Sequence, residues 1–507
     1  MIRRNGAQSW RNVHITEETA VEDLIDIDNS SASGVITPGF DFLRQAASEL
    51  DTIVQQAEQQ GKRVRALGSG WALTDIAVTD GWLINTKLLN GCFELSDNFF
   101  AATYPQSKRP YVVVAQCGIS IGELNIYLET MRTPARALKT SGIGAGQTIA
   151  GAISGNTHGS AINFGATPDY VVGIQLVTGT GRSVWIERQS YSVLNDDFVN
   201  ALGAVAIRND DIFNSAVVSF GAFGVIAAVA LETDPIYQLD FAPVNDISHD
   251  DLKNKLNNFD FSSPQGLYHY EFIFDPYSAS QKAMEAVATK VKFEAGHSAP
   301  NPVWVVRLSN GLAPGDQAAK AFFALPIPPS EKTAFQFEQY RQKCILGNVR
   351  ATPGQVFTAT VTYLEGYMES ALGVSISDAA KMIEISTDVI QQMGLPVMSQ
   401  VRVVHPSAAL LSFTYLGPKT AIFEFGLAND SSVAQFEANL TAALAAEGVG
   451  YTFHWSKNSG ITPERLSTMY GQERITRWLT SRKAVFENDA GLMKVFENEH
   501  LVKAGLA

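Results

Sequence analysis

Gly151-Ala-Ile-Ser-Gly-Asn-Thr-His-Gly159 is the stretch of this 507-residue sequence that says most about its fold. A second glycine run, Gly142-Ile-Gly-Ala-Gly146, lies shortly before it. Glycine at this density destabilises a regular helix or strand, and it lets another group approach the backbone closely. The sequence therefore predicts an irregular segment that wraps around a bulky ligand. His158 is open to a second interpretation, as a core histidine with satisfied hydrogen bonds.

A shorter glycine motif, Gly68-Ser69-Gly70, lies upstream. Residues 62–67 before it and residues 81–86 after it have the pattern of short strands. A strand that runs into Gly-Ser-Gly can direct successive backbone N–H groups at a phosphate. Taken alone the motif is weak, because an ordinary tight turn gives the same pattern.

Length and composition narrow the possible classes of protein. A chain of 507 residues exceeds the size of one hydrophobic core, so at least two domains are expected. The formal charge of -13 disfavours binding to nucleic acid or to an anionic membrane. The 3 cysteines and 8 histidines show neither disulfide nor metal-ligand spacing, so no metal site is expected.

The sequence predicts neither a targeting signal nor a membrane span. The residues after Met1 are polar where a signal peptide needs an apolar run. The most apolar stretch, residues 216–231, is interrupted by glycines and is too short to span a bilayer, so a buried strand is expected there. We therefore predict a cytoplasmic protein without a membrane span.

Hydrophobic periodicity predicts an α+β fold in two main parts. In the first part, strand and helix patterns alternate, with a helix from Thr37-Pro38 to Gly61 and another over residues 121–131. After Asp234-Pro235 the strand candidates become rich in aromatic residues, which indicates a second domain. Its expected elements are strands over residues 267–274, 304–308 and 357–364, a helix over residues 378–392, and a proline-rich surface loop over residues 310–331.

The order of these segments resembles a known family. Residues 148–160, 169–181 and 219–226 are similar to the FAD-binding domain of the vanillyl-alcohol oxidase superfamily. His454-Trp455-Ser456-Lys457 resembles the C-terminal His-Trp-x-Lys signature of the sugar-lactone and alditol oxidase branch. Since both resemblances occur in compatible order, the chain is identified as a relative of that branch.

The resemblance implies a fold and a domain order. Residues 1–235 would form a two-lobed FAD-binding domain. Residues 236–450 would form an α/β substrate domain that caps the flavin. Residues 451–507 would return to the FAD-binding domain.

The resemblance also implies FAD as cofactor and names the residues that hold it. The pyrophosphate would be held by Ala66, Leu67, Gly68, Ser69, Gly70, Trp71 and Ala72. The flavin and its phosphates would be contacted by Gly142, Ile143, Thr148, Gly151, Gly155, Asn156, Thr157 and His158. The adenine end would be bound by Val225 and Ile226.

One departure from the family concerns the attachment of the flavin. Many relatives have a histidine directly after Gly-Ser-Gly and bond it covalently to the flavin. Trp71 occupies that position here. A histidyl bond at this site is therefore excluded, and noncovalent FAD is predicted.

A second departure concerns the catalytic positions. Relatives that oxidise sugars or alditols use a Glu-x-Arg pair, which here reads Gln400-Val401-Arg402. Glu424 stands where alditol oxidases have a histidine, while Lys457 is retained. The resemblance implies hydride removal from a substrate carbon, with Arg402 and Lys457 stabilising negative charge. Glu424 or His454 would accept the proton.

Each of these assignments has a structural alternative. Arg402 would instead pair with a surface carboxylate. Lys457 would be solvated. Glu424, flanked by phenylalanines, would face outward on a strand.

The surrounding residues suggest the substrate and the electron acceptor. Gly142 aligns with a position where a small side chain leaves oxygen a path to the flavin, which favours an oxidase using molecular oxygen. A larger or more apolar substrate than a free polyol is expected from Ile143, which replaces a family serine, and from Phe413, Tyr415, Phe423 and Phe425.

The leading hypothesis is thus an FAD-dependent oxidoreductase acting on an alcohol, lactone or similar carbon of a small molecule. An oxidative cyclase or desaturase is an alternative in the same fold, made plausible by Gln400 in place of glutamate. A flavin- or nucleotide-binding protein without redox activity is the alternative from another class.

Overall fold

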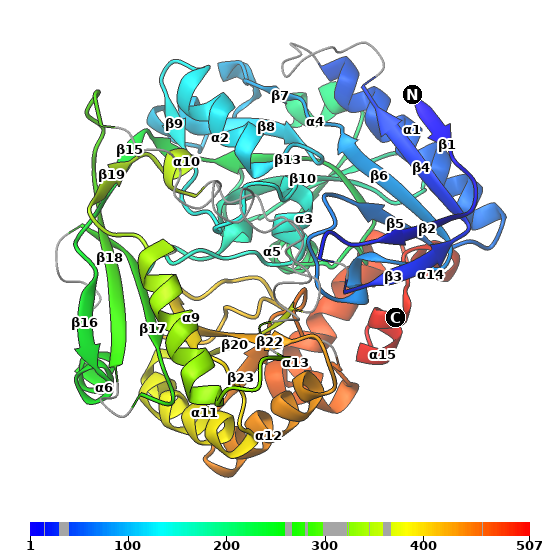
Figure 1. The fold of residues 1–507 in the computed structure, drawn as a ribbon. Coiled ribbons are helices and arrows are strands. Elements are labelled where there is room, and N and C mark those ends of the chain that lie inside the picture. Colours follow the sequence, from blue (N-terminus) through cyan, green and yellow to red (C-terminus); the bar gives the residue numbers. More distant parts are fainter. Residues whose placement is uncertain are drawn as a thin grey trace.

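A computed structural model describes residues 1–14, 16–29, 40–258, 266–278, 282–297, 322, 324–343, 345–357, 367–458 and 460–507. Figure 1 shows the strands from the first part of the chain, in blue to cyan, on one side of the molecule. The green to orange strands and their helices form the other side. The C-terminal helices, in red, return to lie beside the first strands.

The sheet that leads into the Gly-Ser-Gly loop has the strand order β1-β4-β6-β5. β5 (Val64–Leu67) and β6 (Trp82–Leu88) run parallel, and α1 (Phe40–Gln59) packs its apolar face into the same core. Gly61 ends the helix with a φ of +63°, which glycine adopts at low cost. The predicted strands at 62–67 and 81–86 are confirmed, whereas the predicted helix start at Thr37-Pro38 lies outside the described residues.

A second sheet forms the middle of the molecule, in the order β12-β11-β10-β13-β8-β7. β10 (Val171–Val177), β13 (Val225–Glu232) and β8 (Val112–Gln116) are buried along their whole length. Burial on both faces explains why these strands read as uninterrupted apolar runs.

The sequence predicts one buried strand over residues 216–231, but the structure has a strand in only the last part of this stretch. α5 (Asp210–Ala216) ends where the stretch begins, and β13 starts only at Val225. Between them Phe220, Gly221 and Gly224 have φ values of +55°, +76° and +126°. Such dihedral angles cannot continue a strand, so the chain turns there.

Two helices flank the glycine runs. α2 (Ile121–Thr130) begins with a capping box between Ser120 and Glu123, and its predicted extent is confirmed. α3 (Ile149–Ser154) lies inside the segment that was expected to be irregular. Thr148 caps it by accepting a hydrogen bond from the N–H of Gly151, so this short helix tolerates its internal glycine.

The third sheet has the order β19-β15-β18-β17-β21-β22-β20-β23, with β16 paired to β18. α11 (Ala379–Met393) and α12 (Ser432–Ala446) pack together and against its central strands. Figure 1 shows these helices on the side of the sheet that faces away from α3. The central strands are β17 (Leu267–Phe274), β21 (Ser399–Val404), β22 (Thr420–Ala428) and β20 (Tyr367–Ser375), and β23 (Tyr451–Phe453) is the edge strand beside β20.

Several of the helices and strands predicted for the second part of the chain lie among the described residues. The strand over 267–274 and the helix over 378–392 are confirmed. The predicted strand over 304–308, and most of the one over 357–364, lie outside the described residues. The end of the expected loop over 310–331 is instead helical, because α9 (Pro329–Lys343) starts with proline at a position that favours helix initiation.

The remaining elements complete the two parts of the chain. They are β1 (Ile2–Arg4), β2 (Gln8–Arg11), β3 (Glu18–Val21), β4 (Asp23–Asp28), β7 (Cys92–Phe93), β9 (Arg136–Ala137), β11 (Val184–Glu187), α4 (Asp196–Leu202), β12 (Val205–Arg208), β14 (Asp234–Pro235), β15 (Tyr237–Phe241), β16 (Asn245–Ser248), α6 (His249–Asn258), β18 (Lys282–Lys292), β19 (Val349–Ala351) and α10 (Pro353–Val356).

The last helices pack against the first part of the chain. α13 (Pro463–Val485) contacts α5, and α14 (Ala490–Val495) contacts α1. α15 (Glu499–Ala504) places His500 Nδ1 at 2.7 Å from Oδ1 of Asp75. The domain boundaries at 235 and 450 stay a prediction. Among the described helices, none has both the length and the apolar character required to cross a bilayer.

Candidate cofactor and active site

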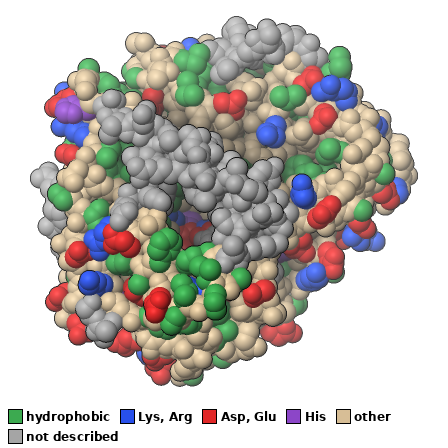
Figure 2. All heavy atoms as spheres, in the orientation of Figure 1, with side chains coloured by type: hydrophobic (Ala, Val, Ile, Leu, Met, Phe, Trp, Pro, Cys, Tyr) green, Lys and Arg blue, Asp and Glu red, His purple; other side chains and the backbone are tan. Residues whose placement is uncertain are grey.

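A cavity of about 390 Å³ lies where the glycine loops of the first part meet the third sheet. Its volume falls within the range of about 300 to 1,000 Å³ that is usual for ligand sites. Figure 2 shows a hollow near the middle of the face in view, with acidic and histidine side chains visible at its floor. The cavity therefore joins segments from both ends of the sequence.

Most of the residues predicted for the cofactor line this cavity. They are Ala66, Leu67, Gly68, Ser69, Gly70, Trp71, Ala72, Gly142, Ile143, Thr148, Gly151, Gly155, Thr157, His158 and Ile226. The predicted catalytic residues Gln400, Arg402, Glu424, His454 and Lys457 line the same cavity. Their individual roles stay predictions.

Asn156 and Val225 are placed differently. Asn156 has a φ of +60°, and its Oδ1 accepts a hydrogen bond from the N–H of Phe413 at 3.1 Å. Val225 is buried at the start of β13, where alternate side chains point to opposite faces, and Ile226 takes the cavity side. Neither residue lines the cavity, and their contact with the cofactor stays a prediction.

The loop from Gly68 to Ala72 has the properties of a phosphate site. None of its backbone N–H groups donates a hydrogen bond to another residue in the described part of the chain. Gly70 has a φ of +70°, and a Cβ added to Gly68 would lie 2.2 Å from Oγ1 of Thr148. Because backbone donors in folded proteins nearly always have partners, a row of free N–H groups beside a cavity is suited to an anion. The loop thus fits the diphosphate of FAD.

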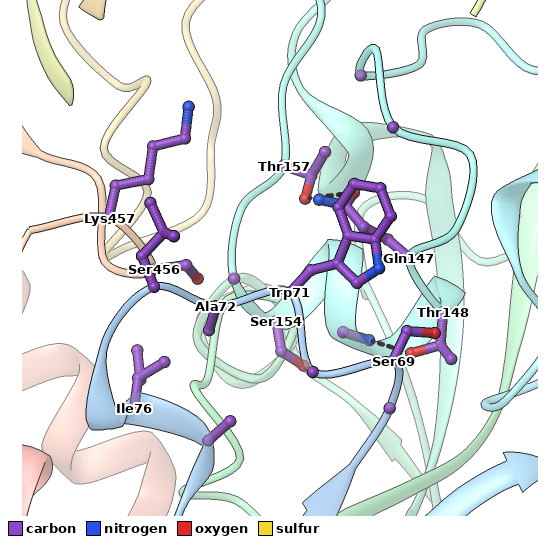
Figure 3. Close-up of a pocket in the computed structure, with 18 of the residues that line it drawn as sticks. Ser69, Trp71, Ala72, Ile76, Gln147, Thr148, Ser154, Thr157, Ser456 and Lys457 are labelled. Atoms are coloured by element: carbon purple, nitrogen blue, oxygen red, sulfur yellow. Dashed lines mark hydrogen bonds between the residues drawn. The ribbon is translucent and has the colours of Figure 1, made fainter. Parts of the chain in front are cut away.

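Part of the glycine density serves packing rather than the ligand. A Cβ added to Gly144 or Gly146 would lie 2.5 Å or 2.6 Å from the indole ring of Trp71. Figure 3 shows this ring next to Thr157 and Gln147. The glycines at 144 and 146 therefore allow Trp71 to lie flat against their loop.

The wall opposite these loops is one face of the third sheet. Glu271 lies directly opposite Arg402 in the β17–β21 register, and Gln400 lies opposite Glu424 in the β21–β22 register. Since alternate residues of a strand share a face, Gln400 and Arg402 point the same way. Glu369 reaches the cavity from β20, the next strand. Four adjacent strands thus carry ionisable side chains on the same face.

Glu424 lies between two cations. Arg402 Nη1 donates to its Oε2 and Lys457 Nζ donates to its Oε1, while His158 Nε2 is 3.7 Å from Oε1. Burial alone would raise the pKa of Glu424, but the charges of Arg402 and Lys457 outweigh it and hold this pKa well below its usual range. Arg402 is 6% exposed and Glu424 is 3% exposed, so neither faces the surface.

Glu369 was missed by the sequence analysis. Its Oε2 lies 2.9 Å from Nζ of Lys457. Burial raises the pKa of Glu369; Lys457 opposes this shift, and the carboxylate of Glu424 adds to it. The available signal was a lone acidic residue inside an apolar strand pattern.

The two site histidines are neutral, with different protonated nitrogens. His454 Nδ1 accepts a hydrogen bond from the N–H of Ser456 at 3.1 Å, so its proton lies on Nε2. His158 Nδ1 is 3.1 Å from the carbonyl of Gly159, so its proton lies on Nδ1. Burial lowers the pKa of His158 to about 4 and the pKa of His454 well below its usual value.

A carboxylate is retained next to Gln400, on the neighbouring strand. Gln400 Nε2 donates to Oε1 of Glu271, and the hydroxyl of Tyr340 donates to the same atom at 3.0 Å. Burial would raise the pKa of Glu271, but Arg402 and His269 lower it overall. The negative charge that the resemblance led us to expect at position 400 is thus present next to it, on Glu271.

The aromatic residues that suggested an apolar substrate lie elsewhere. Phe423 and Phe425 alternate with Glu424 and point into the hydrophobic core. Phe413 is fully buried, and the hydroxyl of Tyr415 donates to the carbonyl of Met469 at 2.6 Å. Of the five residues behind that expectation, Ile143 alone lines the cavity. The sheet wall of the cavity is instead polar and charged.

Comparison with known proteins defines the class of this fold. Residues 42–187 match the FAD binding domain family. Cholesterol oxidase from Brevibacterium sterolicum has a similar structure, with a TM-score of 0.68 and 15% identity over 99% of this chain and 97% of that chain. 6-Hydroxy-D-nicotine oxidase from Arthrobacter nicotinovorans has a TM-score of 0.55 at 13% identity, covering 93% of each chain. These findings show an FAD binding domain over residues 42–187 and a fold similar to that of two-domain flavin oxidases.

The relatives found by sequence similarity are named as sugar-lactone oxidases and dehydrogenases. D-arabinono-1,4-lactone oxidase from Eremothecium gossypii is 28% identical over 202 residues, which are 40% of this chain and 33% of that protein. L-gulono-1,4-lactone dehydrogenase from Mycobacterium tuberculosis is 28% identical over 234 residues, 46% of this chain and 45% of that protein. The chain thus spans less than half the length of these curated relatives. The predicted similarity to sugar-lactone oxidases is confirmed, and the FAD binding domain match agrees with the predicted FAD cofactor. In the described residues no group of His, Cys, Asp and Glu side chains is arranged to hold a metal ion.

Proposed function

We propose that this protein is an FAD-dependent oxidase that removes a hydride from a hydroxyl-bearing carbon, and the proton from its hydroxyl group, in a small molecule such as an alcohol or a lactone. The observation that carries the proposal is the junction of two features in one cavity. Free backbone N–H groups at residues 68–72 face one part of it, and the charged face of the third sheet closes another. FAD, when bound, supplies the acceptor for two electrons.

Oxidation of a hydroxyl needs a group that takes its proton, and we assign this role to Glu369. Its raised pKa makes it a stronger base than Glu424, whose charge two cations stabilise. His454 presents Nε2–H and thus donates a hydrogen bond to a substrate oxygen. Glu369, rather than Glu424 or His454, is thus the proposed base.

Lys457 orients the substrate oxygen and stabilises negative charge on it. Its ammonium group has three N–H donors, and the described residues engage it through the carboxylates of Glu369 and Glu424. The third donor is available to a hydroxyl or alkoxide oxygen. Arg402 holds Glu424 in place through an ion pair. Glu424 in turn fixes the ammonium group of Lys457, so the positive charge of Lys457 keeps its position.

Two further parts of the proposal concern flavin attachment and oxygen. Trp71 has no imidazole with which to form the histidyl bond of many relatives, which supports noncovalent FAD. Gly142 lines the cavity without a side chain, which supports access for molecular oxygen. A Cβ there would lie 2.9 Å from Cγ2 of Thr157.

The test is anaerobic mixing of the purified protein with a panel of alcohols, sugar lactones and amines, followed by flavin absorbance. We expect bleaching by hydroxyl compounds and formation of hydrogen peroxide once air is admitted. Lys457→Met should retain flavin but bleach more slowly. Bleaching by amines alone would contradict the proposed substrate class.

A further inference from the structure

Arg65 is a buried cation to which the proposed chemistry gives no task. It belongs to β5, lines the same cavity and is 3% exposed. Its guanidinium group donates to the carbonyls of Phe496 at 3.2 Å, of Ile76 at 2.6 Å, and of Phe220. Within the described residues no carboxylate forms an ion pair with it.

Carbonyl dipoles only partly replace the water that a buried charge loses. Burial and, to a smaller extent, the nearby charge of Arg482 lower the pKa of Arg65 to about 9. Asp75 opposes this shift, but its carboxylate is already paired with His500 at 2.7 Å. The positive charge of Arg65 is therefore incompletely compensated.

The other cations of the cavity wall are compensated. Arg402 and Lys457 each contact the carboxylate of Glu424. Figure 3 shows Lys457 on the far side of Trp71 from Ser69 and Thr148. Arg65, in contrast, leads directly into the loop of free N–H groups.

We propose that Arg65 supplies the positive charge that neutralises the diphosphate of FAD, while the N–H groups of residues 68–72 supply hydrogen bonds to it. Two N–H donors of the guanidinium group, on Nε and Nη1, have no partner among the described residues. A guanidinium group suits phosphate oxygens because its donors lie in one plane. The inference rests on the FAD assignment of the proposed function.

Arg482 offers a matched control. It is also 3% exposed, and it also donates to backbone carbonyls, those of Ala222, Leu506 and Met493. It does not belong to the cavity lining. A change at Arg482 therefore removes comparable structural hydrogen bonds without touching the proposed diphosphate site.

The experiment compares Arg65→Gln, Arg65→Lys and Arg482→Gln in full-length apoprotein titrated with FAD and with riboflavin, which lacks the diphosphate. We expect Arg65→Gln to weaken FAD binding by roughly 10- to 100-fold, the effect of losing charge-assisted hydrogen bonds, and to leave riboflavin binding unchanged. Arg482→Gln should lower the melting temperature and leave the preference for FAD over riboflavin unaltered. Arg65→Lys should retain most of that preference, because it keeps the charge.

Three results bear directly on the inference. Equal weakening of FAD and riboflavin binding in Arg65→Gln, or no weakening of either, would overturn it. If Arg65→Gln does not fold, loss of the FAD preference in Arg65→Lys would overturn it instead. A wild-type protein that binds neither compound would overturn the FAD assignment itself, so the two failures are distinguishable.

Discussion

The ammonium nitrogen of Lys457 lies 2.9 Å from Oε2 of Glu369, and the same nitrogen contacts Glu424. Two carboxylates, of which Glu424 is fully buried and Glu369 half-buried, therefore share one cation. Only Glu424 receives a second close cation, Arg402, which explains why its pKa is held low while the pKa of Glu369 is raised by burial. The two carboxylates thus have different chemical capacities, one as a fixed charge and one as a base.

The first prediction concerns the pH dependence of substrate oxidation. Glu369 accepts a proton only when ionised, so the rate of flavin reduction should be highest above its raised pKa and fall as the pH decreases through that value. Glu369→Gln should slow the reaction by about 10²- to 10⁴-fold and remove this acid limb. Anaerobic stopped-flow absorbance across pH measures both. An unchanged pH profile in the variant would exclude Glu369 as the base.

The second prediction concerns the stability of the buried charge cluster. Glu424→Gln leaves Arg402 and Lys457 without the carboxylate that separates their charges, which should lower the free energy of unfolding by about 3 to 5 kcal/mol. Glu447→Gln is the control, since Glu447 is exposed and pairs with Lys381 at 2.8 Å. That change should cost no more than about 1 kcal/mol. Urea unfolding of both variants tests the difference, and equal costs would contradict it.

The third prediction concerns the phosphate loop. In Gly68→Ala the new Cβ would lie 2.2 Å from Oγ1 of Thr148, so the loop must shift and FAD binding should weaken strongly. Thr148→Ala in the same chain removes the clashing hydroxyl and should restore part of the affinity. Gly450→Ala is the control, because a Cβ there meets no atom within 4 Å. The flavin content of purified protein reports all three, and full flavin content in Gly68→Ala would argue against this site.

The fourth prediction concerns oxygen. Gly142→Ala should slow reoxidation of the reduced enzyme by air more than it slows reduction by substrate. Its methyl group would lie 2.9 Å from Cγ2 of Thr157, so Thr157→Ser is added to relieve the contact. If the double variant forms hydrogen peroxide at the wild-type rate, Gly142 is not on the oxygen path.

The cofactor side of the site was largely predictable from sequence, because the responsible residues are contiguous. Residues 66–72 follow one another from the end of a strand through the glycine loop, and they line the cavity as expected. Asn156 does not line the cavity: it has a positive φ, and its side chain accepts a hydrogen bond from the N–H of Phe413.

The substrate side was less predictable, because strand register decides it. Glu271, Glu369 and Tyr340 join the site from separate elements with no shared motif. Phe423 and Phe425 were expected to make the pocket apolar, but strand register places them in the core. Adjacent residues of a strand point to opposite faces, so an acidic cavity residue has core neighbours.

The central claim is that this protein holds FAD in its cavity without a covalent bond, and acid precipitation after purification tests it most directly. We expect a yellow protein whose precipitate is colourless and whose supernatant contains one equivalent of FAD. Colour that stays with the precipitate would contradict noncovalent attachment and direct attention to His14, His158 and His454, the histidines of the cavity wall. A purified protein that shows no flavin absorption, even after incubation with FAD, would contradict the account as a whole.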